Sequence, residues 1–205
     1  MPYSLKGRNV LVTGGSRGLG ALIAQRFAAE GANVAINYIS SAQDAENLAV
    51  TLKSDFGVET FTIRGDQGLE RDCIVMVNET IVTLGGIDVV IANAGWTKFT
   101  NFGDLYSMKE SEWDRCWAVN VKGCLHLCRE AMKTFNKNPE GGVFLMTSSA
   151  GGSKFGEERL EALKNKAVLK KETDLEDCAN AFVFAAKNSS LTGASIRVDS
   201  GYAIR

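Results

Sequence analysis

The sequence predicts an α/β fold, a doubly wound parallel sheet with helices on both faces in a three-layer α/β/α arrangement. Two observations indicate it. Over the first 150 residues, short apolar runs alternate with segments whose apolar residues recur at helical spacing. The run at residues 87–92 is almost continuously apolar, which is typical of a strand buried on both faces. A chain of 205 residues is long enough for one well-buried domain, and we assign residues 1–205 to it.

The first predicted strand, residues 9–12, runs into the glycine-rich turn Thr13-Gly14-Gly15-Ser16-Arg17-Gly18-Leu19-Gly20. Gly14 permits a tight turn, Gly18 leaves space for a pyrophosphate, and Gly20 lets the following helix pack close to the strand. The N-terminus of that helix, which ends at Gly31, offers unpaired N–H groups and a partial positive charge. The turn therefore predicts a dinucleotide site. The alternative is a glycine-rich turn without a ligand.

The later elements continue the alternation. Strands are predicted at residues 33–38, 59–63, 87–92 and 142–147, and helices at 44–56, 70–84 and 109–135. A capping box of Thr173 and Glu176 predicts another helix through Lys187. Ligands of open α/β sheets bind beyond the carboxyl ends of the strands. The residues expected along that edge are Gly14, Asn37, Asp66, Asn93 and Ser149.

Composition excludes several classes of function. A formal net charge of -1 without a basic cluster argues against nucleic-acid binding. No apolar run approaches the roughly 20 residues that span a bilayer, and the N-terminus lacks the apolar core of a signal peptide. The five cysteines form no CxxC pair, and Cys124 and Cys128 with His126 between them make no convincing zinc site. We therefore expect reduced thiols, no metal, no membrane segment and a cytoplasmic protein.

Several further motifs occur in a fixed order along the chain. They are Thr13-Gly14-x-x-x-Gly18-x-Gly20, Asp66, Ala92-Asn93-Ala94-Gly95, Asp114 with Val119-Asn120 and Gly123, the run 142–149, and residues 191–201. Together they resemble the short-chain dehydrogenase/reductase family over nearly the whole chain. The resemblance implies a Rossmann-type fold whose last strand is residues 191–201. The cofactor-binding residues it implies are Gly14, Ser16, Arg17, Gly18, Leu19, Asn37, Tyr38, Ser40, Ser41, Asp66, Gln67, Asn93, Ala94 and Gly95.

The residues after the second strand favour NADP(H) over NAD(H). An acid there would bind the ribose 2′-hydroxyl of NAD and repel a 2′-phosphate. This strand is instead followed by Ser40 and Ser41, without a carboxylate, and their hydroxyls and Asn37 are potential hydrogen-bond partners. Arg17 lies in the glycine-rich turn, where a guanidinium can reach the extra phosphate. The alternative for Arg17 is a solvated surface side chain.

The resemblance implies that Ser149 polarises the substrate oxygen and that Asn120 holds a water in a proton relay. The alternatives are an ordinary turn serine and a helix-surface asparagine. The family's catalytic step also needs Tyr-x-x-x-Lys, in which the tyrosine exchanges the proton. Tyrosines occur here only at positions 3, 38, 106 and 202, and none has a lysine four residues later.

Compared with the family, a block of roughly 40 to 50 residues, one helix and one strand, is missing near Ser153. Residues 154–163 resemble the substrate lid that comes later in relatives. Two explanations stay open: the protein lacks the block and the last strand loses its neighbour, or the block was left out of this sequence. The second predicts consecutive Cα atoms within residues 150–157 that are further apart than the roughly 3.8 Å of a trans peptide.

The function expected is an NADP(H)-dependent oxidoreductase that reduces a ketone or oxidises a secondary alcohol on a small molecule. The alternatives are a cofactor-binding protein without dehydrogenase activity and a family member with altered chemistry. Aromatic residues of the loop after residue 95 are expected either to wall an apolar pocket or to pack the loop; they are Trp96, Phe99, Phe102 and Tyr106. The resemblance also implies a homo-oligomer, a tetramer or a dimer, that uses the helix 109–135, which carries Trp113 and Trp117.

Overall fold

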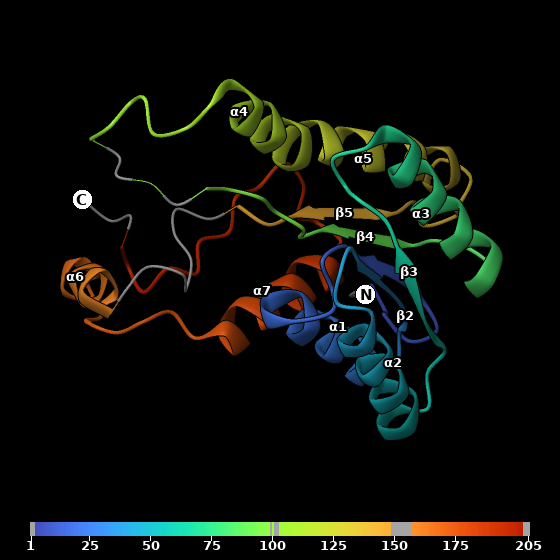
Figure 1. Ribbon diagram of the computed structural model, residues 1–205. Helices are drawn as coiled ribbons and strands as arrows, with labels where there is room; N and C mark the ends of the chain where they lie inside the picture. Colours follow the sequence, from blue (N-terminus) through green and yellow to red (C-terminus); the bar gives the residue numbers. More distant parts are fainter. Residues whose placement is uncertain (1–2, 99, 101–102, 149–156, 203–205) are drawn as a thin grey trace.

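The computed structural model describes residues 3–98, 100, 103–148 and 157–202. Five parallel strands form one sheet in the order β3-β2-β1-β4-β5, between two layers of helices (Figure 1). The strands are β1 (Asn9–Val12), β2 (Asn33–Tyr38), β3 (Thr60–Arg64), β4 (Val89–Ala92) and β5 (Val143–Met146). The helices are α1 (Gly18–Ala29), α2 (Ala42–Phe56), α3 (Glu70–Leu84), α4 (Glu110–Trp117), α5 (Gly123–Phe135), α6 (Glu157–Lys166) and α7 (Leu175–Lys187), with a π-helical turn η1 (Ala118–Lys122) between α4 and α5.

Each face of the sheet has its own core. Side chains alternate along a strand, so Val10 and Val12 of β1 pack towards α1, α2 and α7, while Leu11 packs towards α3 and α5. All residues of β1 and β4 are buried. The predicted parallel α/β fold is therefore confirmed, because only a sheet covered on both faces places such continuous apolar strands in a core.

The strand β5 is less well covered than the others. Its four residues are partly exposed, Met146 to 62%. In the described chain β5 pairs with β4 alone, and a cavity of about 460 Å³ lies between β5, α7 and residues 191–198. The prediction of a last strand at residues 191–201 is wrong for the residues described there, which have no strand structure. A strand needs a hydrogen-bonded neighbour, and the cavity separates this segment from β5.

The predicted long helix 109–135 forms as α4, η1 and α5 in direct succession, with one π-helical turn inside it. One local prediction needs correction. The helix α7 is capped by Asp174 rather than by Thr173, because the Asp174 carboxylate accepts a hydrogen bond from the N–H of Glu176 at 2.8 Å. Of the predicted lid, residues 157–163 lie in α6. Residues 154–156 and most of the segment for which a long Cα separation was predicted lie outside the described residues.

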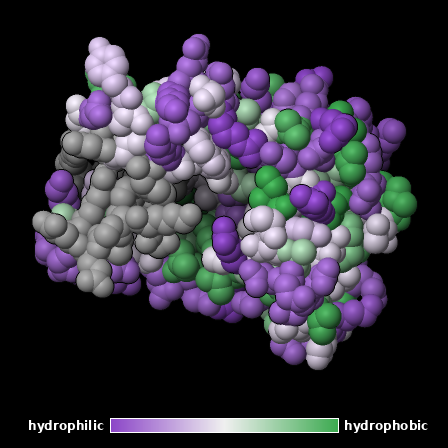
Figure 2. Space-filling model, in the orientation of Figure 1, coloured by the Kyte–Doolittle hydropathy of each residue, from purple (hydrophilic) through white to green (hydrophobic). Residues whose placement is uncertain are grey.

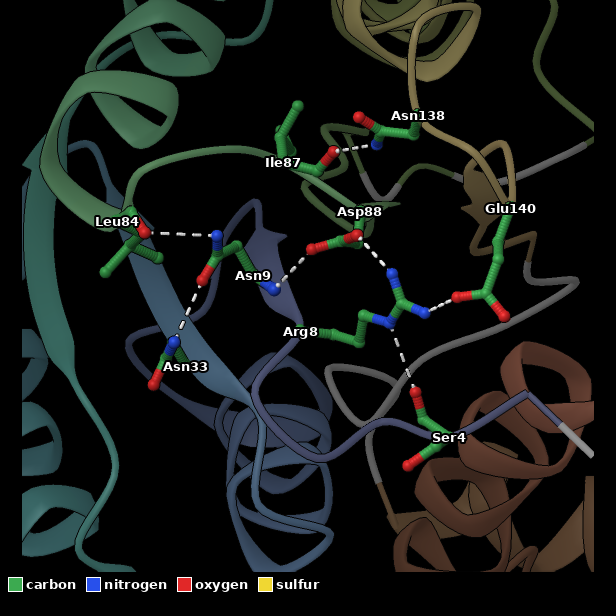
Figure 3. A network of polar contacts seen from close by, with 9 residues as sticks. All are labelled: Ser4, Arg8, Asn9, Asn33, Leu84, Ile87, Asp88, Asn138 and Glu140. Atoms are coloured by element: carbon green, nitrogen blue, oxygen red, sulfur yellow. Dashed lines mark hydrogen bonds and ion pairs between the residues drawn. The ribbon is translucent and has the colours of Figure 1, made fainter.

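At the amino ends of the strands, polar side chains satisfy one another (Figure 3). The Asp88 carboxylate accepts from the backbone N–H of Asn9 at 2.9 Å and from the guanidinium of Arg8 at 3.0 Å. Arg8 also pairs with Glu140. The Asn9 side chain donates to the carbonyl of Leu84 at 3.1 Å and accepts from Asn33 at 2.9 Å. This end of the sheet is therefore closed by a network that joins β1, β2, β4 and the loop before β5.

The outer surface in the view of Figure 2 is mainly hydrophilic, with hydrophobic residues in small groups. Among the described residues, no helix is both long and apolar enough to cross a membrane.

Candidate functional site

The glycine-rich turn links β1 to α1 at the carboxyl edge of the sheet. Gly14 and Gly18 have positive φ angles, +60° and +56°, which disfavour other residues. A Cβ on Gly20 would lie 2.2 Å from the carbonyl oxygen of Gly14, and one on Gly14 would lie 3.1 Å from the Cα of Ala94. A Cβ on Gly18 would meet no atom within 4 Å. Two glycines therefore permit close packing, and the third borders open space at the start of α1.

Arg17 occupies the N-cap position of α1 with extended backbone angles. Its side chain is exposed and has no hydrogen bond or ion pair with the described residues. The first turn of α1 contains no acidic residue and no side chain caps it. The start of this 12-residue helix therefore combines unpaired N–H groups, the positive end of the helix dipole and a free guanidinium, which is an environment suited to an anion.

Asn37 holds this turn in place. Its side-chain oxygen accepts from the N–H of Gly14 at 3.1 Å, and its amide nitrogen donates to the carbonyls of Ile63 at 3.2 Å and Gly65 at 3.0 Å. Its own carbonyl accepts from Gly15 at 2.8 Å. Because the side chain is 2% exposed and its polar atoms are engaged, Asn37 shapes the site rather than offering a free amide to a phosphate.

A second buried network joins the carboxyl ends of β1 and β4. The Thr13 hydroxyl donates to the side-chain oxygen of Gln67 at 2.6 Å and accepts from the N–H groups of Asn93 and Ala94 at 2.9 and 3.0 Å. The Gln67 amide donates to the carbonyls of Ala94 and Val119, both at 3.0 Å. These hydrogen bonds of Gln67, Asn93 and Ala94 therefore hold the backbone at the carboxyl ends of β1 and β4 in place.

The Asn93 side chain extends the same network. Its amide donates to the carbonyl of Thr13 at 3.0 Å, and its oxygen accepts from the hydroxyl of Thr147 at 3.1 Å. Thr13 and Thr147 were not among the predicted site residues. Their position at the carboxyl ends of β1 and β5 is the signal that identifies them, since both follow the last apolar residue of a strand.

Asp66 lies at the carboxyl end of β3 and is already paired. Its carboxylate contacts the guanidinium of Arg115 at 2.9 Å and accepts from the N–H of Gly68 at 2.8 Å. A Cβ on Gly68 would lie 2.4 Å from Arg115, so the small residue admits this ion pair. Arg115 is a further residue that sequence inspection missed, because the pair joins α4 to a residue 49 positions earlier.

Asn120 lies in the π-helical turn η1, an irregularity that is frequent at functional sites. Its side-chain oxygen accepts from the N–H of Trp96 at 2.9 Å, and its amide donates to the carbonyl of the same residue at 2.7 Å. These two bonds hold the loop after β4 against η1. Asn120 is nevertheless exposed, so it lies at the surface of the site. Ser149, the other predicted catalytic residue, lies outside the described residues.

The other predicted residues surround the turn. Ser16 and Leu19 are half-buried in it, and Leu19 also borders the cavity beside β5. Beyond β2, Tyr38 packs partly into the core, Ser40 is exposed, and Ser41 is the N-cap of α2 without a side-chain cap bond.

The aromatic residues of the loop after β4 differ in their burial. Trp96 is half-buried, whereas Tyr106 is 95% exposed. Phe99 and Phe102 lie outside the described residues. The same loop includes Lys98, whose bond to Glu112 at 2.9 Å is the main cause of a lowered pKa of that carboxyl.

Two thiols, those of Cys73 and Cys124, lie next to Gln67. Cys73 is buried, donates to the carbonyl of Gln67 at 3.2 Å, and has a pKa raised to about 12, mainly by burial and secondarily by the nearby Asp72 carboxylate. Burial also raises the pKa of Cys124. These thiols are held in their neutral form and act as packing groups. In the described residues no cluster of histidine, cysteine and acidic side chains could hold a metal ion.

The sequence is similar to those of known proteins. The family model described as short chain dehydrogenase matches residues 8–159. A short chain dehydrogenase from Claviceps purpurea is 33% identical over 149 residues, which is 73% of this chain and 54% of the relative. A 3-oxoacyl-(acyl-carrier-protein) reductase from Staphylococcus epidermidis is 36% identical over 144 residues, 70% of this chain and 57% of the relative. The chain thus spans about half the length of the curated relatives it matches.

Solved structures share the fold. The NADPH-dependent 3-quinuclidinone reductase of Rhodotorula rubra superposes with a TM-score of 0.87 at 19% identity, covering 98% of this chain and 93% of the other. A short chain dehydrogenase from Burkholderia cenocepacia in complex with NADP gives a TM-score of 0.83 at 21% identity, covering 98% and 99%. The matched motifs, the parallel sheet and the relatives agree: this chain belongs to the short chain dehydrogenase family.

Proposed function

We propose that the protein binds NADP(H) at the carboxyl edge of the sheet and serves as an oxidoreductase that interconverts a ketone and a secondary alcohol. The observation that carries the proposal is the start of α1, where Gly14, Gly18 and Gly20 shape an open turn and Arg17 has no polar partner among the described residues. The NADP and NADPH named with the two structural relatives support the same choice of cofactor.

The residues present fit this dinucleotide. The N–H groups at the start of α1 suit a pyrophosphate, and the guanidinium of Arg17 suits the 2′-phosphate. The hydroxyls of Ser16, Ser40 and Ser41 supply further donors. No carboxylate lies between Tyr38 and Ser41 to repel the phosphate. Asp66 is already paired with Arg115, and its place in the site is to border the adenine end.

When bound, the cofactor supplies or accepts the hydride. Asn120 holds the loop after β4 through Trp96, and we propose that it also anchors the water of a proton relay. Ser149, which follows Thr147 and Ser148 in the sequence, is proposed to polarise the substrate oxygen. The proton donor that the family places on a tyrosine has no counterpart in this sequence, so full activity requires a Tyr-x-x-x-Lys segment that the sequence does not contain.

That missing motif favours a second candidate, a cofactor-binding protein without dehydrogenase activity. The exposed side of β5 and the cavity beside it agree with an absent neighbouring strand. The two candidates share the cofactor site and differ in whether the native protein has the additional segment.

We also propose a cytoplasmic homo-oligomer. On α4, η1 and α5, apolar side chains recur every four residues and are 43% to 60% exposed; they are Trp113, Trp117, Val121 and Leu125. A stripe of this kind is unfavourable in water and suits a contact with a second copy. The cysteines among the described residues are free thiols, in agreement with a reducing compartment.

The first experiment is the intact mass of the protein from its native source, combined with NADPH and NADH titrations. A mass near 22.1 kDa would favour the binding protein. A mass larger by roughly 4 to 5 kDa, one helix-strand unit, would favour the reductase, and NADPH oxidation with a panel of ketones would then test it. Absence of NADPH binding in either form would reject both candidates.

A further inference from the structure

Arg64 is a second arginine at the carboxyl edge of the sheet. It is the last residue of β3 and pairs in register with Tyr38, the last residue of β2. Its side chain is exposed, and its Nε donates to the carbonyl of Ile39 at 3.3 Å. In the described part of the chain, its two terminal amino groups have no partner. The guanidinium is therefore held over the loop after β2 with donors still free.

The sheet order places this loop between two arginines. Because the strands are adjacent in the order β3-β2-β1, residues 39–41 follow the middle strand, Arg64 ends the strand on one side, and Arg17 belongs to the turn after β1 on the other. Neighbouring parallel strands lie about 4.8 Å apart, which is within the reach of an arginine side chain.

Hydrogen bonds keep these segments in place. The N–H of Gly65 donates to the carbonyl of Tyr38 at 3.0 Å, and the N–H of Gly15 donates to the carbonyl of Asn37 at 2.8 Å. The end of β2 is thereby tied to the residue after Arg64 and to the glycine-rich turn. Both arginines project from segments whose backbones are fixed relative to the loop.

The local charge balance favours an anion. The loop carries the hydroxyls of Ser40 and Ser41 and no acid, and the nearest acid along the chain is Asp44 in the first turn of α2. Neither Arg17 nor Arg64 forms an ion pair with a described residue. An arginine beside a phosphate can form two parallel N–H···O bonds, which makes the interaction directional as well as strong.

We propose that Arg64 is a specificity residue that binds the ribose 2′-phosphate of NADP(H) from the side opposite Arg17. This inference rests on the proposed function, since it concerns the same cofactor site. The contact with Ile39 positions the guanidinium before the ligand arrives, so little conformational entropy is lost on binding.

The test measures binding of 2′,5′-ADP and 5′-AMP by calorimetry, since the two nucleotides differ in the 2′-phosphate. Arg64→Ala is expected to weaken 2′,5′-ADP about tenfold or more, the effect of one lost charged hydrogen-bond pair, and to change 5′-AMP less than about twofold. Arg64→Lys, which keeps the charge without the planar fork, is expected to fall between Arg64→Ala and the wild type. Arg71→Ala is the matched control, because Arg71 is also an exposed arginine, lies in the first turn of α3, and pairs only with Asp72 among the described residues.

The outcomes separate the two proposals. If the wild type prefers 2′,5′-ADP and Arg17→Ala removes the preference while Arg64→Ala keeps it, the proposal for Arg64 is overturned and the cofactor assignment stands. If Arg64→Ala weakens both nucleotides equally, Arg64 only supports the loop and the proposal is also overturned. If the wild type shows no preference between the two nucleotides, the NADP(H) assignment fails together with the inference. Thermal unfolding of each variant checks that the fold is retained.

Discussion

The two ends of the sheet are built from the same strands and differ in how their polar groups are used. At the amino ends, Arg8, Asn9 and Asp88 bind one another and the backbone (Figure 3). At the carboxyl ends, the buried groups of Thr13 and Asn37 bind the backbone in a similar way, but Arg17 lacks a polar partner among the described residues. A hydrogen-bonded network is therefore common to both ends. The open glycine-rich turn and the free cations distinguish the candidate site.

The largest change in stability is expected from Gly20→Ala. The added Cβ would lie 2.2 Å from the carbonyl oxygen of Gly14, so α1 must shift away from β1. We expect the free energy of unfolding to fall by about 3 kcal/mol and NADPH binding to be lost, as measured by urea denaturation and by titration. Ala29→Ser, on the exposed side of the same helix, is the control with an expected change below about 0.5 kcal/mol. Retention of wild-type stability in Gly20→Ala would show that the close packing is unimportant.

Asp88→Ala instead disrupts the hydrogen-bond network at the amino ends of the strands. It removes the acceptor of the Asn9 N–H and the partner of Arg8. A loss of about 2 kcal/mol in the free energy of unfolding is expected, with NADPH affinity of the folded protein unchanged. Asp88→Asn keeps one oxygen acceptor and should lose less. A selective loss of affinity in Asp88→Ala would contradict the separation between the two ends.

Cys73, which is buried near the carboxyl ends of the strands, makes the free energy of unfolding depend on pH. Its pKa is raised from 9.0 to about 12 in the folded protein, mainly by burial, so above pH 9 the unfolded chain releases a proton that the folded chain retains. The stabilisation is complete below pH 9 and is lost as the pH rises towards 12, at about 1.4 kcal/mol per pH unit. Urea denaturation at pH 8 to 10.5 measures the slope. Cys73→Ala should be less stable at pH 8 but should lack this contribution to the slope; an equal slope in both proteins would exclude Cys73 as its source.

Arg17→Ala is expected to have the smallest effect on stability and a clear effect on binding. The side chain is exposed and has no polar partner among the described residues, so the free energy of unfolding should change by less than about 0.5 kcal/mol. NADPH affinity should fall about tenfold, while NADH affinity stays nearly constant. Fluorescence titration of both cofactors measures this difference. Equal losses for the two cofactors would place Arg17 away from the 2′-phosphate.

Much of the site was predictable from local sequence. The glycine-rich turn, the acid after β3 and the motif after β4 each follow an apolar run, so their place at one edge follows from parallel strands. The part played by each side chain was less predictable. Asn37 was expected to be available to a phosphate, yet its amide is used by Gly14, Ile63 and Gly65. Such contacts bring together residues distant in the chain.

The order of the first five strands and their helices, the glycine-rich turn and the absence of a Tyr-x-x-x-Lys motif were predictable from the sequence, because periodicity, backbone freedom and residue identity are local properties. The ion pair of Asp66 with Arg115, the π-helical turn within the helix carrying Asn120, and the separation of residues 191–198 from the sheet depend on tertiary contacts. An alternating apolar pattern allows a strand, but a strand forms only where a neighbouring backbone offers hydrogen bonds, and here a cavity lies between this segment and β5.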